Sequence, residues 1–285
     1  MMELVQEQPV AQPDRDPNSS ITGDLRIHDF ASRILRNTRK LRVWLPPGYD
    51  APANTNRYPV LYLQDGQNLF DRVTAFGGVE WQVDETADFL IREGKIPPMI
   101  IVGIDNTGRD RLREYIPYRS FNPPVLRPQG KRYADFMLRE ILPFVEREYR
   151  LAKGPEHTGI GGSSLGGLIS LYTAMEGKGI FGKLLIESPS LFVAGRAILR
   201  EARSLVDWPH RVYLGVGTRE TGNEAKDAFV VEDVQELEAI LRRRGLGQDR
   251  LLVNVQEGAP HSEGAWASRF PEALSFLFGE HSHHS

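Results

Sequence analysis

Ile160-Gly161-Gly162-Ser163-Ser164-Leu165-Gly166-Gly167 is the stretch that decides the fold. It contains Gly162-x-Ser164-x-Gly166, a pattern in which a serine stands on a sharp turn between a strand and a helix. An apolar run that suits a helix follows, from Leu168 to Ala174. Small neighbours are needed because the turn strains the serine backbone and the chain packs closely on both sides. We therefore predict that Ser164 points out of a sheet, at the positive end of a helix.

Length and composition limit the classes of protein to which the chain can belong. The chain has 285 residues, of which 40% are hydrophobic and 26% charged, which suits one α/β domain with a large core. The 35 basic and 38 acidic residues give a net charge of −3, so charge gives no case for nucleic acid or an anionic membrane as partner. The absence of cysteine excludes disulfides, thiolate metal sites and a cysteine nucleophile. No apolar run approaches the ~20 residues of a membrane span.

The two ends of the chain are polar. We expect residues 1–23 to form a flexible N-terminal arm and residues 280–285 to be a disordered or artificially added tail. The catalytic domain is then residues 24–279. Because the N-terminus has neither a basic start nor an apolar stretch, it does not read as a signal peptide, and we expect a cytoplasmic protein unless a signal was removed. A homodimer stays open.

Strand-like and helix-like segments alternate through the domain. Two alternating runs come first, at 25–30 and 40–45, and predict an antiparallel pair at a sheet edge. Apolar strands and amphipathic helices then alternate, except in a long segment at 105–130 that we expect to be irregular. The expected strands are 58–63, 99–104, 157–161, 183–187, 211–216 and 250–255, and the expected helices are about 79–93, 132–146, 168–174, 227–244 and 263–278, with a short one within 188–208.

This order predicts an α/β fold with a mostly parallel sheet of about eight strands, an antiparallel N-terminal edge and helices on both faces. About two dozen residues separate the strand at 183–187 from the strand at 211–216. That is too few for a cap domain, so we expect an open cleft. Its walls would be the segments 70–78, 105–130 and 188–192.

A base must take the proton of a serine hydroxyl before the oxygen becomes a good nucleophile. His210 lies in a surface loop beside a proline, and His281, His283 and His284 lie in the tail. His261 instead follows the last strand and precedes the last helix. We therefore predict that His261 is the general base for Ser164.

The order serine, acid, histidine places the acid after the strand at 211–216. Glu220 is the first carboxylate past the end of that strand, and it would orient His261 and stabilise the imidazolium. Glu224 and Asp227 are rivals a little further on. We predict Glu220.

A developing oxyanion needs two fixed amide donors in a dry place. The Leu165 N–H, next to the nucleophile, is the first that we expect. The second should come from the loop after the strand at 58–63, where Gly66 allows close approach and the Gln67 N–H is the better candidate. Asp65 is unexpected there, because a bare carboxylate would repel an oxyanion.

Several motifs together resemble one known family. They are Tyr58-Pro-Val-Leu-Tyr-Leu-Gln-Asp-Gly-Gln-Asn-Leu-Phe70, Ile101-Val-Gly-Ile-Asp105-Asn106, Arg111-Leu-Arg113-Glu114-Tyr115, Gly162-Ser-Ser164-Leu-Gly166-Gly167, Gly217-Thr-Arg-Glu220 and His261-Ser-Glu-Gly-Ala-Trp266. The chain is similar, from about 23 to 279, to the family named Putative esterase, which includes enterobactin-type siderophore esterases, esterase D-like enzymes and feruloyl esterases. The resemblance implies an α/β-hydrolase fold and ester hydrolysis without metal or cofactor. Many members carry Asp where this chain has Glu220.

Substrate contacts are expected from the same motifs. The residues are Gly66, Asp105, Arg111, Arg113, Glu114 and Tyr115. Arg109, Arg111 and Arg113 could meet an acidic or phenolic substrate; equally, they could pair with Asp105, Asp110 and Glu114 to hold the loop.

The prediction is a serine carboxylesterase that acts on short-chain, hydroxycinnamoyl or siderophore-type esters through an acyl-enzyme. The partner would be a small-molecule or sugar-linked ester. Two alternatives stay open at this point: an acyltransferase that uses the same Ser-Glu-His site, and a non-catalytic binding module with the same fold.

Overall fold

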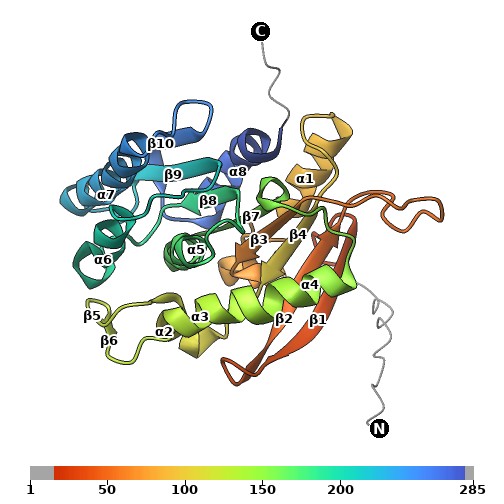
Figure 1. Ribbon diagram of the computed structural model, residues 1–285, viewed down its shortest axis with the longest axis horizontal. Helices are drawn as coiled ribbons and strands as arrows, with labels where there is room; N and C mark the ends of the chain where they lie inside the picture. Colours follow the sequence, from red (N-terminus) through yellow and green to blue (C-terminus); the bar gives the residue numbers. More distant parts are fainter. Residues whose placement is uncertain (1–15, 280–285) are drawn as a thin grey trace.

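The computed structural model describes residues 16–279, so the expected tail and the first fifteen residues of the expected arm lie outside the described residues. Eight strands form the main sheet in the order β1-β2-β4-β3-β7-β8-β9-β10 (Figure 1). Their bounds are β1 (Asp24–Ser32), β2 (Asn37–Leu45), β3 (Val60–Gln64), β4 (Ile100–Ile104), β7 (Thr158–Ser163), β8 (Lys183–Glu187), β9 (Arg211–Arg219) and β10 (Leu251–Pro260).

The pairing confirms the predicted topology. β1 pairs with β2, and β2 with β4, in antiparallel register, while every pair from β4 to β10 is parallel. Parallel neighbours put all their carboxyl ends at one edge of the sheet, which is where ligands bind in open α/β sheets. The loops after β3, β7, β8, β9 and β10 therefore meet along that edge.

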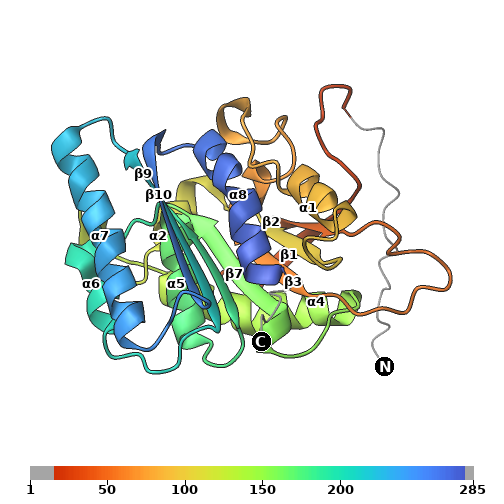
Figure 2. The same ribbon diagram turned by 90° about the horizontal axis from the view of Figure 1, so that it is seen from above.

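Helices cover both faces of the sheet. Figure 2 shows α5, α6 and α7 on one side, and α1 and α8 on the other. The helix bounds are α1 (Val83–Arg92), α2 (Arg111–Tyr115), α3 (Gly130–Phe136), α4 (Leu142–Glu148), α5 (Leu165–Glu176), α6 (Val193–Ala202), α7 (Glu224–Arg243) and α8 (Glu263–Phe278).

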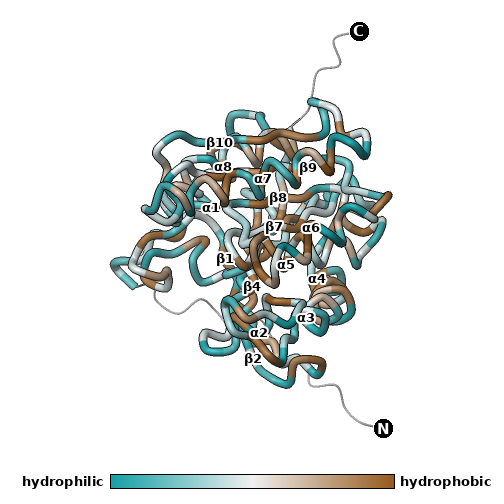
Figure 3. Tube along the Cα trace, turned by 90° about the vertical axis from the view of Figure 1, so that its left-hand side faces the viewer, coloured by the Kyte–Doolittle hydropathy of each residue, from teal (hydrophilic) through white to brown (hydrophobic). Residues whose placement is uncertain are grey.

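Two apolar cores result, one on each face. Alternate strand residues point to opposite faces, so Tyr62 and Val102 join the core beneath α3 to α7, while Leu61 and Leu63 join the core beneath α1 and α8. Figure 3 shows apolar residues concentrated along the central strands. Because the central strands are buried on both faces, they read as continuous apolar runs in the sequence.

Three expectations about the elements need correction. The segment 105–130 is not irregular throughout, because it contains α2 and a small hairpin of β5 (Ser120–Phe121) and β6 (Pro124–Val125). The helix expected at 132–146 is α3, a π-helical turn at Met137–Ile141 and α4. The last strand runs on to Pro260 through a register shift after Gln256. The apolar period of the sequence does not report such irregular turns, because they keep the same face buried.

The described part of the N-terminal arm contacts the domain. The Thr22 amide donates to Asp84 Oδ2 at 2.6 Å, and the Ser19 hydroxyl donates to Asp71 Oδ2 at 3.0 Å. The Trp44 indole donates to the Thr22 carbonyl at 2.8 Å. These contacts fix residues 19–22 against the segment that leads into α1.

Candidate active site

Ser164 stands between β7 and α5 in a strained backbone conformation. Its φ is 56° and its ψ is −124°, a region that residues with a side chain rarely adopt. A Cβ on Gly162 would lie 2.9 Å from the backbone of Gly166, so the turn closes only with glycine at that position. The Ser164 amide donates to the Glu187 carbonyl at 2.9 Å, which ties the turn to the end of β8.

Glu220 and His261 come together at the ends of β9 and β10. His261 Nδ1 lies 2.5 Å from Glu220 Oε2, with the carboxylate buried and the imidazole about one-third exposed. The rivals lie elsewhere: Glu224 is exposed in the first turn of α7, and Asp227 accepts hydrogen bonds from the Thr221 amide and hydroxyl. Of the three carboxylates, Glu220 is therefore the one that His261 contacts.

The other oxygen of Glu220 is also held. Oε1 accepts hydrogen bonds from Ser188 Oγ at 2.7 Å and from the Gly217 amide at 2.6 Å. Burial alone would raise the pKa of Glu220, but the hydrogen bonds from His261, Ser188 and Gly217 outweigh it and hold the pKa below its ordinary value. The carboxylate thus stays ionised beside the imidazole.

A buried network supports this pair from α8 and β8. Trp266 packs edge-on against His261 with ring centroids 5.0 Å apart, and its indole donates to Ser188 Oγ at 2.9 Å. Arg269 donates to Glu187 Oε2 at 3.0 and 2.7 Å. The sequence predicts packing by Trp266 under the histidine loop, but it gives no sign of Ser188 or Arg269. Position is the one sequence feature that could have indicated these two residues. Ser188 directly follows β8, and Arg269 lies about one turn after Trp266 on α8.

Ser164 Oγ faces Ser190, whose hydroxyl oxygen lies 3.4 Å away. Within residues 16–279, Ser164 and His261 form no direct hydrogen bond. Catalytic hydrogen bonds are often long or poorly aligned before substrate binds.

Charge pairing fixes the position of the loop after β3. Asp65 adopts a left-handed conformation with φ of 59°, and its carboxylate accepts two hydrogen bonds of 2.8 Å from Arg111 and one of 2.7 Å from Asn106. These donors compensate the charge of the carboxylate, so Asp65 is not the bare carboxylate that the sequence made unexpected at this loop. A Cβ on Gly66 would lie 2.6 Å from the Gly103 backbone, so glycine brings this loop against β4.

The two expected oxyanion donors are unused. In the described part of the chain, neither the Leu165 amide nor the Gln67 amide donates to a protein acceptor. Leu165 is in the first turn of α5, where amides lack partners within the helix. Gln67 lies in a 3-10 turn, and its side-chain Oε1 accepts from the Asn106 amide at 3.2 Å.

The residues that we expected to contact substrate differ in how deeply they are buried. Asp105 pairs with Arg42 at 2.8 Å, Glu114 pairs with Arg39 at 3.0 Å, and Tyr115 is fully buried. Each of these three side chains therefore has a protein partner behind the loop. Arg111 and Arg113 are partly exposed, and Arg113 pairs with Asp110 at 3.6 Å.

No helix within the described residues is both long enough and apolar enough to cross a membrane.

Comparisons with known proteins bear on this geometry. The chain is 25% identical over 248 residues to "Uncharacterized protein YbbA" of Bacillus subtilis (strain 168), a match that covers 85% of this chain and 93% of the relative. Its fold superposes on the enterobactin esterase FES of Shigella flexneri, solved in the presence of enterobactin, with a TM-score of 0.71 at 20% identity. That match covers 94% of this chain but 62% of the FES chain.

A further solved structure agrees in fold. The IroE-like serine hydrolase of Shewanella oneidensis matches with a TM-score of 0.69 at 22% identity, over 90% of this chain and 80% of the other. The family model described as "Putative esterase" matches residues 32–277, which run from the last residue of β1 to the end of α8 less one residue. The chain therefore belongs to the Putative esterase family and has the α/β-hydrolase fold of its structural relatives.

Proposed function

We propose that the protein is a serine carboxylesterase in which Ser164, His261 and Glu220 form the catalytic triad. The observation that carries the proposal is the 2.5 Å contact between His261 Nδ1 and Glu220 Oε2, at the sheet edge where Ser164 stands on its strained turn. This contact leaves His261 Nε2 to take a proton, because Nδ1 is engaged by the carboxylate.

Acylation follows from these roles. Ser164 Oγ attacks the ester carbonyl as His261 Nε2 takes its proton, and the Leu165 and Gln67 amides donate to the oxyanion. The imidazolium, stabilised by Glu220, then gives the proton to the leaving alcohol, and the acyl group stays on Ser164. Removing one oxyanion donor in such a site costs about 10²–10³ in kcat.

Deacylation repeats the steps with water. His261 takes a proton from water, the hydroxide attacks the acyl-enzyme, and the proton returns to Ser164 as the carboxylic acid leaves. The 3.4 Å contact with Ser190 supports the orientation of Ser164 Oγ before substrate binds.

Two exposed phenylalanines support an ester with an aromatic ring. Phe192 is 48% exposed and follows Ser190 by two residues. Phe76 is 80% exposed, and its amide is held by Asn68, the neighbour of Gln67. Aromatic side chains of this kind pair with rings in a ligand. The class includes hydroxycinnamoyl esters and catecholate siderophore esters, and the FES structure was solved in the presence of enterobactin.

The test compares Ser164→Ala with Ser163→Ala on a p-nitrophenyl acyl ester. We expect Ser164→Ala to fold and to lose turnover to near background, and to resist labelling by a fluorophosphonate. Ser163→Ala is the matched control, since Ser163 lies in β7 beside the turn, and should keep turnover and labelling. Turnover retained by Ser164→Ala would exclude the proposal.

A further inference from the structure

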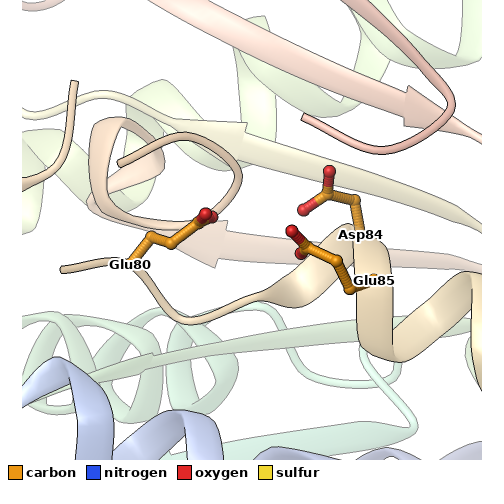
Figure 4. Close-up of side chains that lie close together, drawn as sticks. All are labelled: Glu80, Asp84 and Glu85. Carbon is orange, nitrogen blue, oxygen red and sulfur yellow. The ribbon is translucent and has the colours of Figure 1, made fainter. Parts of the chain in front are cut away.

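Three carboxylates meet where the chain enters α1, away from the candidate triad. Figure 4 shows the side chains of Glu80, Asp84 and Glu85 pointing toward one another, and one oxygen of each lies within 4.8 Å of the others. Glu80 is 6% exposed and Asp84 is fully buried. Glu85 is partly exposed. Acidic groups are usually found in solvent, so two buried carboxylates beside a third require a physical explanation.

Their charge is not compensated by the protein. Among residues 16–279, no Lys, Arg or His forms an ion pair with any of the three. Arg72, whose charge lowers the pKa of Glu80 only weakly against burial, is exposed and donates its Nε–H to the Asn18 carbonyl. Burying an unpaired carboxylate is costly, so the cluster must hold either protons or a cation.

Individual oxygens in the cluster also lack partners. Glu80 Oε2, Asp84 Oδ1 and Glu85 Oε2 are buried and accept no hydrogen bond from a described residue. The opposite oxygens are used: Glu80 Oε1 accepts from the Ser20 hydroxyl, and Asp84 Oδ2 accepts from the Thr22 amide at 2.6 Å. Each of these two side chains is therefore fixed by one oxygen and presents the other without a partner.

We propose that Glu80, Asp84 and Glu85 bind one Ca²⁺ ion. The ligand atoms are all oxygens, which suits a hard cation and not zinc or copper. Ca–O distances of about 2.3–2.6 Å allow two ligands of one ion to be about 5 Å apart, which covers the observed 4.8 Å limit. Mg²⁺ dehydrates reluctantly and usually keeps several waters with one or two carboxylates, so a group of three carboxylates suits Ca²⁺ better.

Without a cation the cluster holds protons. Burial, reinforced by neighbouring carboxylates, raises the pKa of Glu80 to about 7 and that of Asp84 to about 9. Calcium would displace these protons on binding. It would also fasten two segments, because Ser20 and Thr22 are bonded to the same carboxylates from the N-terminal side.

The test uses the full chain after removal of metal with EGTA. Calorimetric titration with CaCl₂ should give one ion per chain, with protons released, and saturating Ca²⁺ should raise Tm by about 5 °C. The double variant Glu80→Gln/Glu85→Gln should show neither effect. Glu93→Gln, an exposed carboxylate at the end of the same helix, is the matched control and should bind as the parent does.

A second measurement needs no variant. Tb³⁺ in the cluster should luminesce on excitation of tryptophan, because Trp81 adjoins Glu80, and Ca²⁺ should quench the signal by displacement at concentrations where Mg²⁺ does not. An absence of heat, of Tm shift and of Tb³⁺ emission at millimolar metal would overturn the proposal in favour of shared protons. So would equal loss of binding in Glu93→Gln. Because every readout is binding, failure of the esterase assignment would not affect the result.

Discussion

Trp266 and Ser188, 78 residues apart in the chain, are joined by a hydrogen bond of 2.9 Å from the indole N–H to the serine oxygen. The same serine donates to Glu220 at 2.7 Å. Helix α8 therefore reaches the carboxylate through the residue that follows β8, while its N-terminal side adjoins His261. A single packed unit therefore sets the positions of both Glu220 and His261.

The Ser188→Ala variant removes the hydroxyl that links Trp266 to Glu220. Glu220 would lose one of the bonds that favour its ionised form, so its pKa should rise and the acid limb of kcat/KM should move to higher pH. We expect kcat at pH 8 to fall by about 10-fold with KM little changed. Trp266→Phe, which removes the indole N–H together with part of the ring, should move the acid limb in the same direction by less. A uniform loss at all pH values would mean that Ser188 only packs.

Acid stability should report Glu220 directly. Its pKa in the folded protein is below the ordinary value of 4.5, so the unfolded chain binds a proton first as pH falls. The stability that it contributes is fully present above about pH 4.5 and is lost as pH falls through the depressed pKa. Urea unfolding of the parent and of Glu220→Gln should therefore differ by a constant amount from pH 7 to 5, and should converge toward pH 3. A gap that widens on acidification would contradict this sign.

Gly66→Ala should displace the loop that carries the Gln67 amide. The new Cβ would lie 2.6 Å from a backbone atom of Gly103, and a backbone atom cannot move aside as a side chain end would. We expect a loss of about 1–3 kcal/mol in the free energy of unfolding and at least 10-fold in kcat. Gly264→Ala, in open space within the first turn of α8, is the control and should keep both. Equal kinetics in the two variants would remove Gln67 from the oxyanion site.

The Phe192→Ala variant tests whether the exposed ring of Phe192 contacts an aromatic ring of the ester. Loss of one ring pair is worth about 0.5–1.5 kcal/mol, so kcat/KM for a feruloyl ester should fall by about 2- to 10-fold. Turnover of an acetyl ester should not change, since it offers no ring. Phe229→Ala, exposed on α7, controls for general loss of surface aromatic area. An equal fall in kcat/KM for both esters would mean that Phe192 supports the structure and does not contact the aromatic ring of the ester.

The fold was predictable because its signals are local. Continuous apolar runs such as Met99–Ile104 mark strands buried on both faces, and Gly162 and Gly166 mark a turn that only small residues permit. Charge pairing was not predictable in the same way. A carboxylate at position 65 was unexpected, because the sequence does not show which residue pairs with Asp65. Its partner, Arg111, lies 46 positions away and is one of several similar arginines in its segment. Spacing does not say which of them the fold will bring near.

The site was predictable to the level of loops, and not beyond. Chain order after successive strands led to Glu220 and His261, which the structure brings within 2.5 Å. Ser188 carries no motif of its own, because a serine after a strand is common and its value depends on what two distant segments place around it. The extension of β10 to Pro260 was hidden by its glycine and polar residues, which read as a loop.

The order of strands has a consequence for how this protein could change. Ser164, Glu220 and His261 follow β7, β9 and β10, whereas the segment 105–130 follows β4, on the far side of β3. The proposed triad thus stands on one half of the sheet, and the segment 105–130, which holds the loop after β3 through Asn106 and Arg111, stands on the other. Changes within that one contiguous stretch would therefore reach the loop that carries the Gln67 amide, while Ser164, Glu220 and His261 keep their own supports.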